Sequence, residues 1–245
     1  MPVRSFADKI GGILDVTAEE RRALDRLLER ERAVRRGATL VRENERSTEL
    51  FAVKSGMMLG YVLLDDGSRQ VLRFLFPGDM VGAAVCAYGK APQTLVALAD
   101  SVIAVVDRTQ LAALMYRQPR LAMAMVALEQ VERTALTDRL AGVGRLSARA
   151  RVAAVLLDIR DRMRRCDPTI GASFMLGLTQ EEIGDATGLT AVHVNRMLRQ
   201  LEEQGMIART AGRVTVLDEP ALMRAANYVN RLAGVDLSWL PATGA

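Results

Sequence analysis

The sequence predicts an α+β chain with an N-terminal β-roll, a long helix and a C-terminal winged helix-turn-helix domain. Three observations predict it. Short segments rich in β-branched residues alternate with turn residues over 39–107, a long apolar helical pattern starts at Pro119, and two helices meet at a tight glycine turn at Gly188. The expected domains are residues 1–118, residues 119–144 with a hinge, and residues 145–245.

The composition is that of a globular protein, because half of the 245 residues are apolar and a quarter are charged. The first residues, MPVRSFADK, lack the apolar stretch of a secretory signal, and no apolar run approaches the length of a membrane span. We therefore expect a soluble, cytoplasmic protein that does not interact with membranes. The net charge of +4 is mild and favours a polyanionic partner without identifying one.

The N-terminal part predicts a helix and then a roll. Thr17 and Glu20 form a capping box, in which each side chain binds the other residue's backbone amide, so a helix begins there. From Thr39 onward the segments TLVREN, ELFAVKSGMMLGYVLL, SRQVLRFLF and TLVALADSVIAVVD are separated by turn signals such as Pro77-Gly78-Asp79. Strands at this spacing predict a small barrel or roll rather than a parallel sheet.

Asp107 is expected to cap a short helix, and Pro119 to open a long helix that reaches about Ala141. The first half of the long helix is apolar on nearly all sides, so one face should pack on the roll and another on a second copy of the chain. The alternative is a central helix in a monomeric core. Gly142 and Gly144 interrupt the pattern, and we expect a hinge there. The residues expected at the dimer interface are Leu121, Met125, Leu128, Val131 and Ala135.

Residues 178–207, LTQEEIGDATGLTAVHVNRMLRQLEEQGMI, predict a helix-turn-helix. Thr179 and Glu182 form a second capping box, so a short helix begins there. Gly188 occupies the position of a helix-ending residue, and Thr190 begins the next helix at once. Two helices joined by so short a turn form this motif.

The second helix of the motif has one apolar side and one polar side. At 100° per residue, its polar side carries Val192, Asn195, Arg196 and Arg199, with His193 on the flank. A helix in the major groove presents such residues to base edges, and the planar fork of arginine suits guanine. The alternative is a solvated helix face, which the tight turn, the caps and the following hairpin disfavour.

The segment MIARTAGRVTVLD predicts a β-hairpin, the wing, with its turn at Ala211-Gly212. Arg209 and Arg213 are candidates for contacts with phosphate. Asp218 should cap a last helix, and the tail beyond it could pack back or stay loose.

The roll, the long helix, the hinge and the 178–207 segment together resemble the CRP/FNR family, named for the cyclic-AMP receptor and the fumarate–nitrate regulator. The resemblance covers about residues 10–218. It implies a cyclic-nucleotide-binding-like jelly roll and a homodimer paired through the 119–141 helix. It also implies binding to double-stranded DNA at an inverted repeat, and contact with RNA polymerase if the protein activates transcription.

By position in the family motif, Val192, Asn195 and Arg196 match residues that read bases. Val192 stands where the family commonly has glutamate, which accepts a hydrogen bond from cytosine, whereas valine offers only an apolar surface. The positions that match phosphate contacts are Gln180, Thr190, His193 and Arg199.

The effector pocket of the family would involve Gly82, Ala83 and Thr94. Ala83 replaces the family's ribose-binding glutamate and Gln93 replaces its phosphate-binding arginine, so we expect no tight binding of cyclic AMP. No cofactor is expected. The cysteine set of an iron–sulfur cluster is missing, and a haem held by Cys86 or Met80 is not favoured. An apolar effector, or none, fits the sequence as well.

A second hypothesis is a ligand-responsive roll domain that signals to a protein partner without specific DNA binding. A gel-shift titration separates the two, because only a regulator of the CRP/FNR type should retain DNA in a salt-dependent manner. An enzyme is not expected, because the sequence offers no nucleophile–base pair, phosphate-binding glycine loop, metal cluster or carboxylate pair in a motif context.

Overall fold

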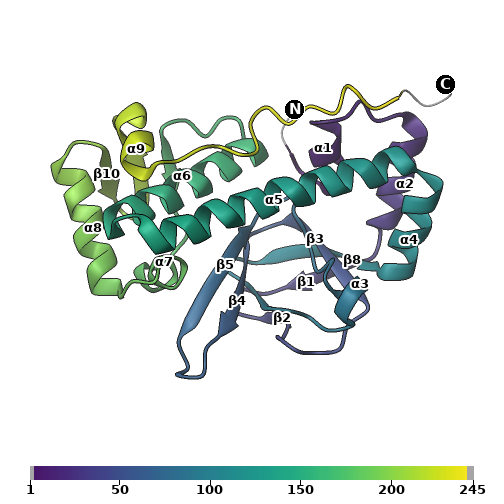
Figure 1. Ribbon diagram of the computed structural model, residues 1–245, viewed down its shortest axis with the longest axis horizontal. Coiled ribbons are helices and arrows are strands. Elements are labelled where there is room, and N and C mark those ends of the chain that lie inside the picture. Colours follow the sequence, from purple (N-terminus) through teal and green to yellow (C-terminus); the bar gives the residue numbers. More distant parts are fainter. Residues whose placement is uncertain (1–2, 242–245) are drawn as a thin grey trace. The chain divides into compact units, whose positions relative to one another are not determined.

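The computed structural model describes residues 3–241, and its contacts divide the chain into two compact units (Figure 1). Of the described residues, the first unit contains 3–62, Phe74–Arg133 and 232–241. The second unit contains Leu63–Arg73 and Thr134–Arg231. Among the described residues, no helix is long and apolar enough to cross a membrane.

The first unit is a β-roll with flanking helices, as the sequence predicts. Two four-stranded antiparallel sheets form the roll, in the orders β1-β8-β3-β6 and β2-β7-β4-β5. The strands are β1 (Glu31–Val34), β2 (Thr39–Val41), β3 (Glu49–Ser55), β4 (Met58–Leu63), β5 (Arg69–Leu75), β6 (Met80–Val81), β7 (Thr94–Ala97) and β8 (Ser101–Asp107). The helices are α1 (Phe6–Gly11), α2 (Ala18–Leu27), α3 (Val85–Tyr88) and α4 (Arg108–Arg117).

The predicted helix starts in this unit are confirmed. The Thr17 hydroxyl accepts from the Glu20 amide at 3.2 Å, and the Glu20 carboxylate accepts from the Thr17 amide at 2.9 Å. Asp107 accepts from the amide of Thr109 at 2.8 Å and so caps α4. These signals are local, so the sequence around each start determines it.

The long helix α5 (Pro119–Arg145) continues through both glycines, so its predicted end near Ala141 is wrong. The Leu146 amide still donates to the Gly142 carbonyl at 2.9 Å, and Gly142 is buried. A glycine inside a helix costs about 1 kcal/mol relative to alanine, which the packing of a buried segment can outweigh.

The predicted dimer face of α5 needs correction. Leu121 and Leu128 are only 0% and 5% exposed in the core of the first unit, and Met125 packs against the same core. A partner chain cannot reach the two leucines. Helical periodicity identifies an apolar face but not what covers it. Val131 and Ala135 are half-buried. The exposed apolar side chains of α5 are Met123, Val126, Leu136, Leu140 and Val143.

The second unit is a helical domain with a small sheet. Helix α6 contacts α7, α8 and α9, and the buried faces of these helices form its interior. The three-stranded antiparallel sheet has the order β10-β11-β9. The elements are α6 (Ala148–Cys166), β9 (Ser173–Met175), α7 (Gln180–Thr187), α8 (Ala191–Glu203), β10 (Ile207–Thr210), β11 (Arg213–Val216) and α9 (Glu219–Ala226).

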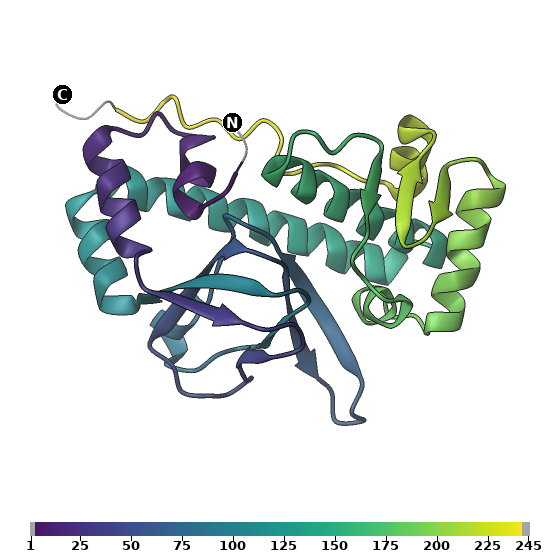
Figure 2. The same cartoon turned by 180° about the vertical axis from the view of Figure 1, so that it is seen from behind.

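Two segments lie in a different unit from the one that the predicted boundaries gave them. The tail after α9 packs back on the first unit, where Leu232 and Leu237 are buried and the Leu237 amide donates to the Ile13 carbonyl at 3.3 Å. Figure 2 shows the tail beside α1 from behind. Residues 63–73 belong to the second unit, although they include the last residue of β4 and the part of β5 up to Arg73; we call this segment the hairpin. Both placements depend on contacts distant in sequence, which local patterns do not reveal.

Candidate nucleic-acid interface

The first helix of the predicted motif, α7, begins at the expected cap. The Glu182 amide donates to the Thr179 hydroxyl at 3.1 Å, and the Thr179 amide donates to the Glu182 carboxylate at 2.7 Å. Gln180 is therefore the first residue of the helix, and its side chain is exposed. This position leaves the amide group of Gln180 accessible to a phosphate.

The turn between α7 and α8 depends on two glycines. Gly188 ends α7 with a φ of 67°, a left-handed conformation that favours glycine. Gly184 is needed for a different reason: a Cβ at Gly184 would lie 2.4 Å from the carbonyl oxygen of Leu189. The amide of Leu189 also donates to the Gly184 carbonyl at 3.0 Å. The backbone of Gly184 is therefore in direct contact with the backbone of Leu189, and this contact fixes the turn.

Helix α8 starts at Thr190 and buries one side. The Thr190 hydroxyl accepts from the His193 amide at 3.3 Å and lies 3.1 Å from the imidazole Nδ1. His193 is therefore fixed at the start of the helix, where backbone amides carry partial positive charge. The buried side chains of α8 are Val194, Met197, Leu198 and Leu201, which is the apolar side that the sequence predicts.

The opposite side of α8 is accessible. Val192 is 81% exposed, Arg196 and Arg199 are exposed, and Asn195 is half-buried. Arg196 makes no hydrogen bond or ion pair with any other described residue. A guanidinium without an internal partner can present all of its donors to a ligand. We call Val192, Asn195, Arg196 and Arg199 the recognition edge.

The wing is present, and its two arginines differ in their contacts. Ala211 and Gly212 have φ values of 51° and 78°, as a two-residue hairpin turn between β10 and β11 requires. Arg213 is exposed and donates to the Ser173 hydroxyl at 3.4 Å. Arg209 instead pairs with Glu202 at 2.7 Å, and this hydrogen bond lowers the pKa of the Glu202 carboxyl. Arg209 therefore supports the contact between α8 and β10.

Sequence reasoning missed two supports of the turn. Arg151 of α6 donates to the carbonyl oxygen of Thr187 at 2.7 Å, at the end of α7. No local signal marks Arg151, because its partner lies 36 residues away. Gly184 does carry a signal, because a glycine inside a short helix indicates close packing.

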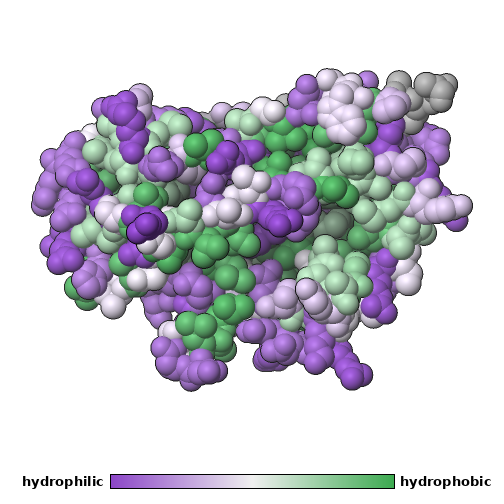
Figure 3. All heavy atoms as spheres, viewed as in Figure 1, coloured by the Kyte–Doolittle hydropathy of each residue, from purple (hydrophilic) through white to green (hydrophobic). Residues whose placement is uncertain are grey.

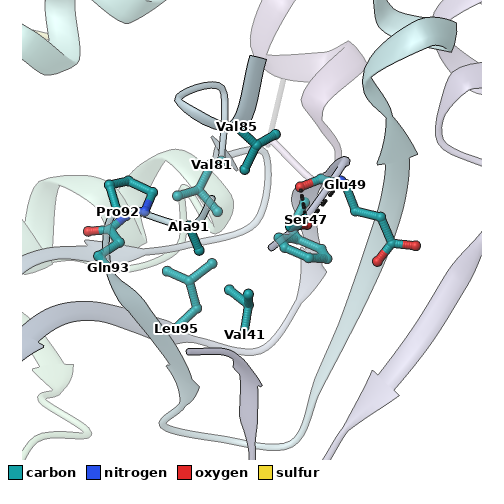
Figure 4. Close-up of a pocket in the computed structure, with 11 residues that line it drawn as sticks. Val41, Ser47, Glu49, Val81, Val85, Ala91, Pro92, Gln93 and Leu95 are labelled. Carbon is teal, nitrogen blue, oxygen red and sulfur yellow. Dashed lines mark hydrogen bonds between the residues drawn. The ribbon is translucent and has the colours of Figure 1, made fainter. Parts of the chain in front are cut away.

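The pocket in the roll differs from the one expected from Gly82, Ala83 and Thr94. Gly82 lines it, whereas Ala83 is exposed on the surface and the buried Thr94 hydroxyl accepts from the Glu43 amide at 3.0 Å. The volume of the pocket is about 260 Å³, which includes space open to solvent. Figure 4 shows its apolar side chains facing one another. The lining residues are Val41, Ser47, Glu49, Phe51, Val81, Gly82, Val85, Ala91, Pro92, Gln93 and Leu95.

The polar groups of this pocket do not form an anion site. The Glu49 carboxylate points away from Val41 and Leu95 (Figure 4) and pairs with Arg30 at 3.0 Å and Arg32 at 3.4 Å. None of the lining residues is basic. A buried phosphate would therefore lack a cationic partner at this site.

Two family models match the chain. A Crp-like helix-turn-helix domain matches residues 150–225, and a cyclic nucleotide-binding domain matches residues 31–118. The fumarate and nitrate reduction regulatory protein of Escherichia coli strain K12 is 27% identical over 212 residues, which cover 86% of this chain and 84% of that protein.

Solved structures of regulators resemble most of the chain. FixK2 from Bradyrhizobium japonicum aligns with a TM-score of 0.71 and 25% identity, covering 82% of this chain and 98% of its own. TTHB099, a transcriptional regulator of the CRP family from Thermus thermophilus, aligns with a TM-score of 0.59 and 26% identity, covering 80% of this chain and 97% of its own.

Proposed function

Because the chain belongs to the CRP/FNR family of transcription regulators, we propose that it binds double-stranded DNA as a homodimer and reads an inverted repeat with the recognition edge of α8. The proposed site of action is the cytoplasm. If this protein activates transcription, RNA polymerase is the further partner that we propose.

One observation carries the proposal: the recognition edge of α8 is accessible, whereas the opposite side of the helix is buried. The groups on this edge match the chemistry of the major groove. Arg196 can donate to O6 and N7 of guanine together, the Asn195 amide can pair with adenine, and Val192 can contact the methyl group of thymine. These three residues would supply sequence specificity.

The residues around the edge suit the DNA backbone. Thr190 and His193 lie at the start of α8, where the helix end favours a phosphate. Arg199 lies one turn beyond Asn195. Gln180 is exposed on α7, which contacts α8, and Arg213 is exposed on β11, which pairs with β10. Phosphate contacts of this kind would fix the orientation of α8 without reading sequence.

The exposed apolar residues of α5 support the homodimer. Leu136 and Leu140 are 50% and 73% exposed and lie four residues apart, so they share one side of the helix. Val126 and Leu140 are two heptads apart. Figure 3 shows apolar atoms, interrupted by polar ones, along the part of the surface that α5 crosses. A second copy of α5 would cover these side chains.

Selection from a random pool of double-stranded DNA should enrich an inverted repeat whose half-sites lie roughly 10 base pairs apart, because a two-fold dimer places its recognition helices one DNA turn apart. Sequencing of the bound fraction checks the site, and sedimentation velocity checks for a mass of two chains. A pool without any enriched sequence would contradict the DNA proposal, and a single half-site or a monomer would contradict the dimer.

Leu140→Asp is the variant for the dimer part of this test. A carboxylate placed among the exposed apolar side chains of α5, which we call the seam, should shift the protein to monomer and weaken binding to the repeat. Tyr116→Asp is the matched control, because Tyr116 is 90% exposed on α4, outside the seam. It should leave both the mass and the affinity unchanged.

We further propose that the roll does not bind cyclic AMP tightly. Without an arginine the phosphate loses a charge-assisted hydrogen bond of about 1.5–3 kcal/mol, which is roughly tenfold or more in affinity. The lining of the pocket is also without any basic residue that could replace this arginine. Isothermal calorimetry should therefore give no micromolar or tighter constant for cyclic AMP, and such a constant would overturn the proposal.

Gln93→Arg supplies the missing cation and should raise the affinity for cyclic AMP. The Gln93 side chain packs directly against Gly60, where a Cβ would lie 2.7 Å from the amide oxygen, so Gly60 leaves the space that the side chain at position 93 occupies. We propose no metal site, since the described residues contain no group of three His, Cys, Asp or Glu side chains that could hold a metal ion.

A further inference from the structure

The hairpin of residues 63–73 contacts the first helix of the helix-turn-helix through the start of β5. Residues 63–73 form part of the second unit. Within it, Arg69 donates to one carboxylate oxygen of Asp185 from two nitrogens, Nε at 2.7 Å and Nη2 at 2.6 Å. The two side chains are 30% and 20% exposed, so the pair is partly shielded from water. Shielding strengthens an ion pair relative to one on the open surface.

The neighbouring residue, Gln70, binds the backbone of the same helix. Its side-chain amide donates to the Asp185 carbonyl oxygen at 2.9 Å. Asp185 lies in the last turn of α7, where carbonyl groups lack partners within the helix. The Leu189 amide cannot serve it, because that amide bonds to Gly184. Gln70 therefore satisfies a carbonyl that the tight turn leaves open.

The hairpin is itself anchored in the second unit. Arg139 of α5 donates to the carbonyl oxygen of Leu72 and pairs with Asp158 of α6 at 3.2 Å. From α6, Arg151 holds the Thr187 carbonyl. Side chains from β5 and from α6 thus hold the end of α7. The arginines among them, Arg69 and Arg151, complement the negative end of the α7 dipole.

We propose that Arg69 and Gln70 are positioning residues for DNA recognition: they fix the end of α7 and, through the tight turn, the orientation of α8. Only Gly188, Leu189 and Thr190 separate the two helices, so a displacement at Asp185 passes directly to the recognition helix. With the hairpin in place, Val192 stays 81% exposed and Arg196 remains accessible. The docked hairpin is therefore compatible with DNA binding, and its release loosens the turn. This inference rests on the proposed DNA-binding function.

The test uses the full chain and its selected DNA site. Arg69→Ala and Gln70→Ala should each weaken binding by about 2- to 30-fold, the range of coupling that a residue outside the binding surface can exert. Arg69→Lys should retain most of the affinity. The reversed pair Arg69→Asp with Asp185→Arg should recover a large part of the loss of Arg69→Asp alone, which a general defect in stability would not do.

Arg32→Ala is the matched control, because it removes an arginine–carboxylate pair with Glu49 inside the first unit. It should leave DNA binding unchanged. Fluorescence anisotropy measures the affinities. Hydrogen exchange without DNA measures the backbone amides of residues 184–190, and it should be faster in Arg69→Ala than in the parent chain.

The two proposals fail separately. If the parent chain binds its selected site and Arg69→Ala binds as tightly or more tightly, the positioning role is overturned. If the parent chain binds no DNA, the proposed function fails. The exchange experiment then tests the hairpin by itself: equal exchange of residues 184–190 in Arg69→Ala and in the parent chain overturns the role of the hairpin at the turn.

Discussion

Arg196→Ala is expected to weaken binding to the selected DNA site by about 1–3 kcal/mol, or roughly 5- to 150-fold. Arg196 is exposed on the recognition edge and makes no hydrogen bond or ion pair with another described residue, so its removal should not destabilise the folded chain. The interaction removed would be the bidentate pair with guanine. Fluorescence anisotropy measures the affinity, and a second round of site selection should show relaxed preference at one base of each half-site.

Arg199→Ala provides the matched comparison on the same helix. A phosphate contact carries no sequence information, so this variant should weaken binding to all sequences alike. The slope of log affinity against log salt should fall by about 0.9 for each phosphate that the variant no longer neutralises. If Arg196→Ala keeps the parental base preference, Arg196 does not read a base.

Gly184→Ala is expected to disrupt the helix-turn-helix. The new methyl group would lie 2.4 Å from the carbonyl oxygen of Leu189, and backbone cannot rotate away as a side chain can. Forcing such a contact costs about 1–3 kcal/mol of unfolding free energy, and any relief has to move the turn that leads into α8. Chemical denaturation measures the stability, and DNA titration should show a loss of affinity even where the protein remains folded.

Gly144→Ala is the control for this substitution. Gly144 lies in α5, and an alanine Cβ there would have no neighbouring atom within 4 Å, so alanine should stabilise the helix by up to about 1 kcal/mol. If Gly184→Ala leaves both the stability and the DNA affinity unchanged, the close contact between residue 184 and the Leu189 carbonyl is not required for the turn.

Local signals in the sequence predicted most of the helix-turn-helix. The capping box of Thr179 and Glu182, the helix-ending Gly188 and the start at Thr190 each depend on residues within a few positions, and all three are present. The two sides of α8 follow from helical periodicity alone. The roll also follows from strand spacing and turn residues, which is why its architecture is predictable without knowledge of individual contacts.

Features set by distant contacts were not predictable in the same way. Leu121 and Leu128 look the same in sequence whether they face a partner or their own core. The ion pair of Arg69 and Asp185 joins residues 116 positions apart, and no periodic pattern relates them. The helix through Gly142 shows the opposite case, in which packing outweighs a local preference.

The route of the chain limits how this protein can be divided. Each compact unit is assembled from non-contiguous stretches: the second includes the hairpin at 63–73, and the first includes the tail with Leu237. A fragment that starts at α6 would lack Arg69 and Gln70 and would carry an apolar tail without its binding surface. The two halves are therefore not interchangeable modules, and a recombination that exchanges one of them has to carry the hairpin and the tail across with their respective units.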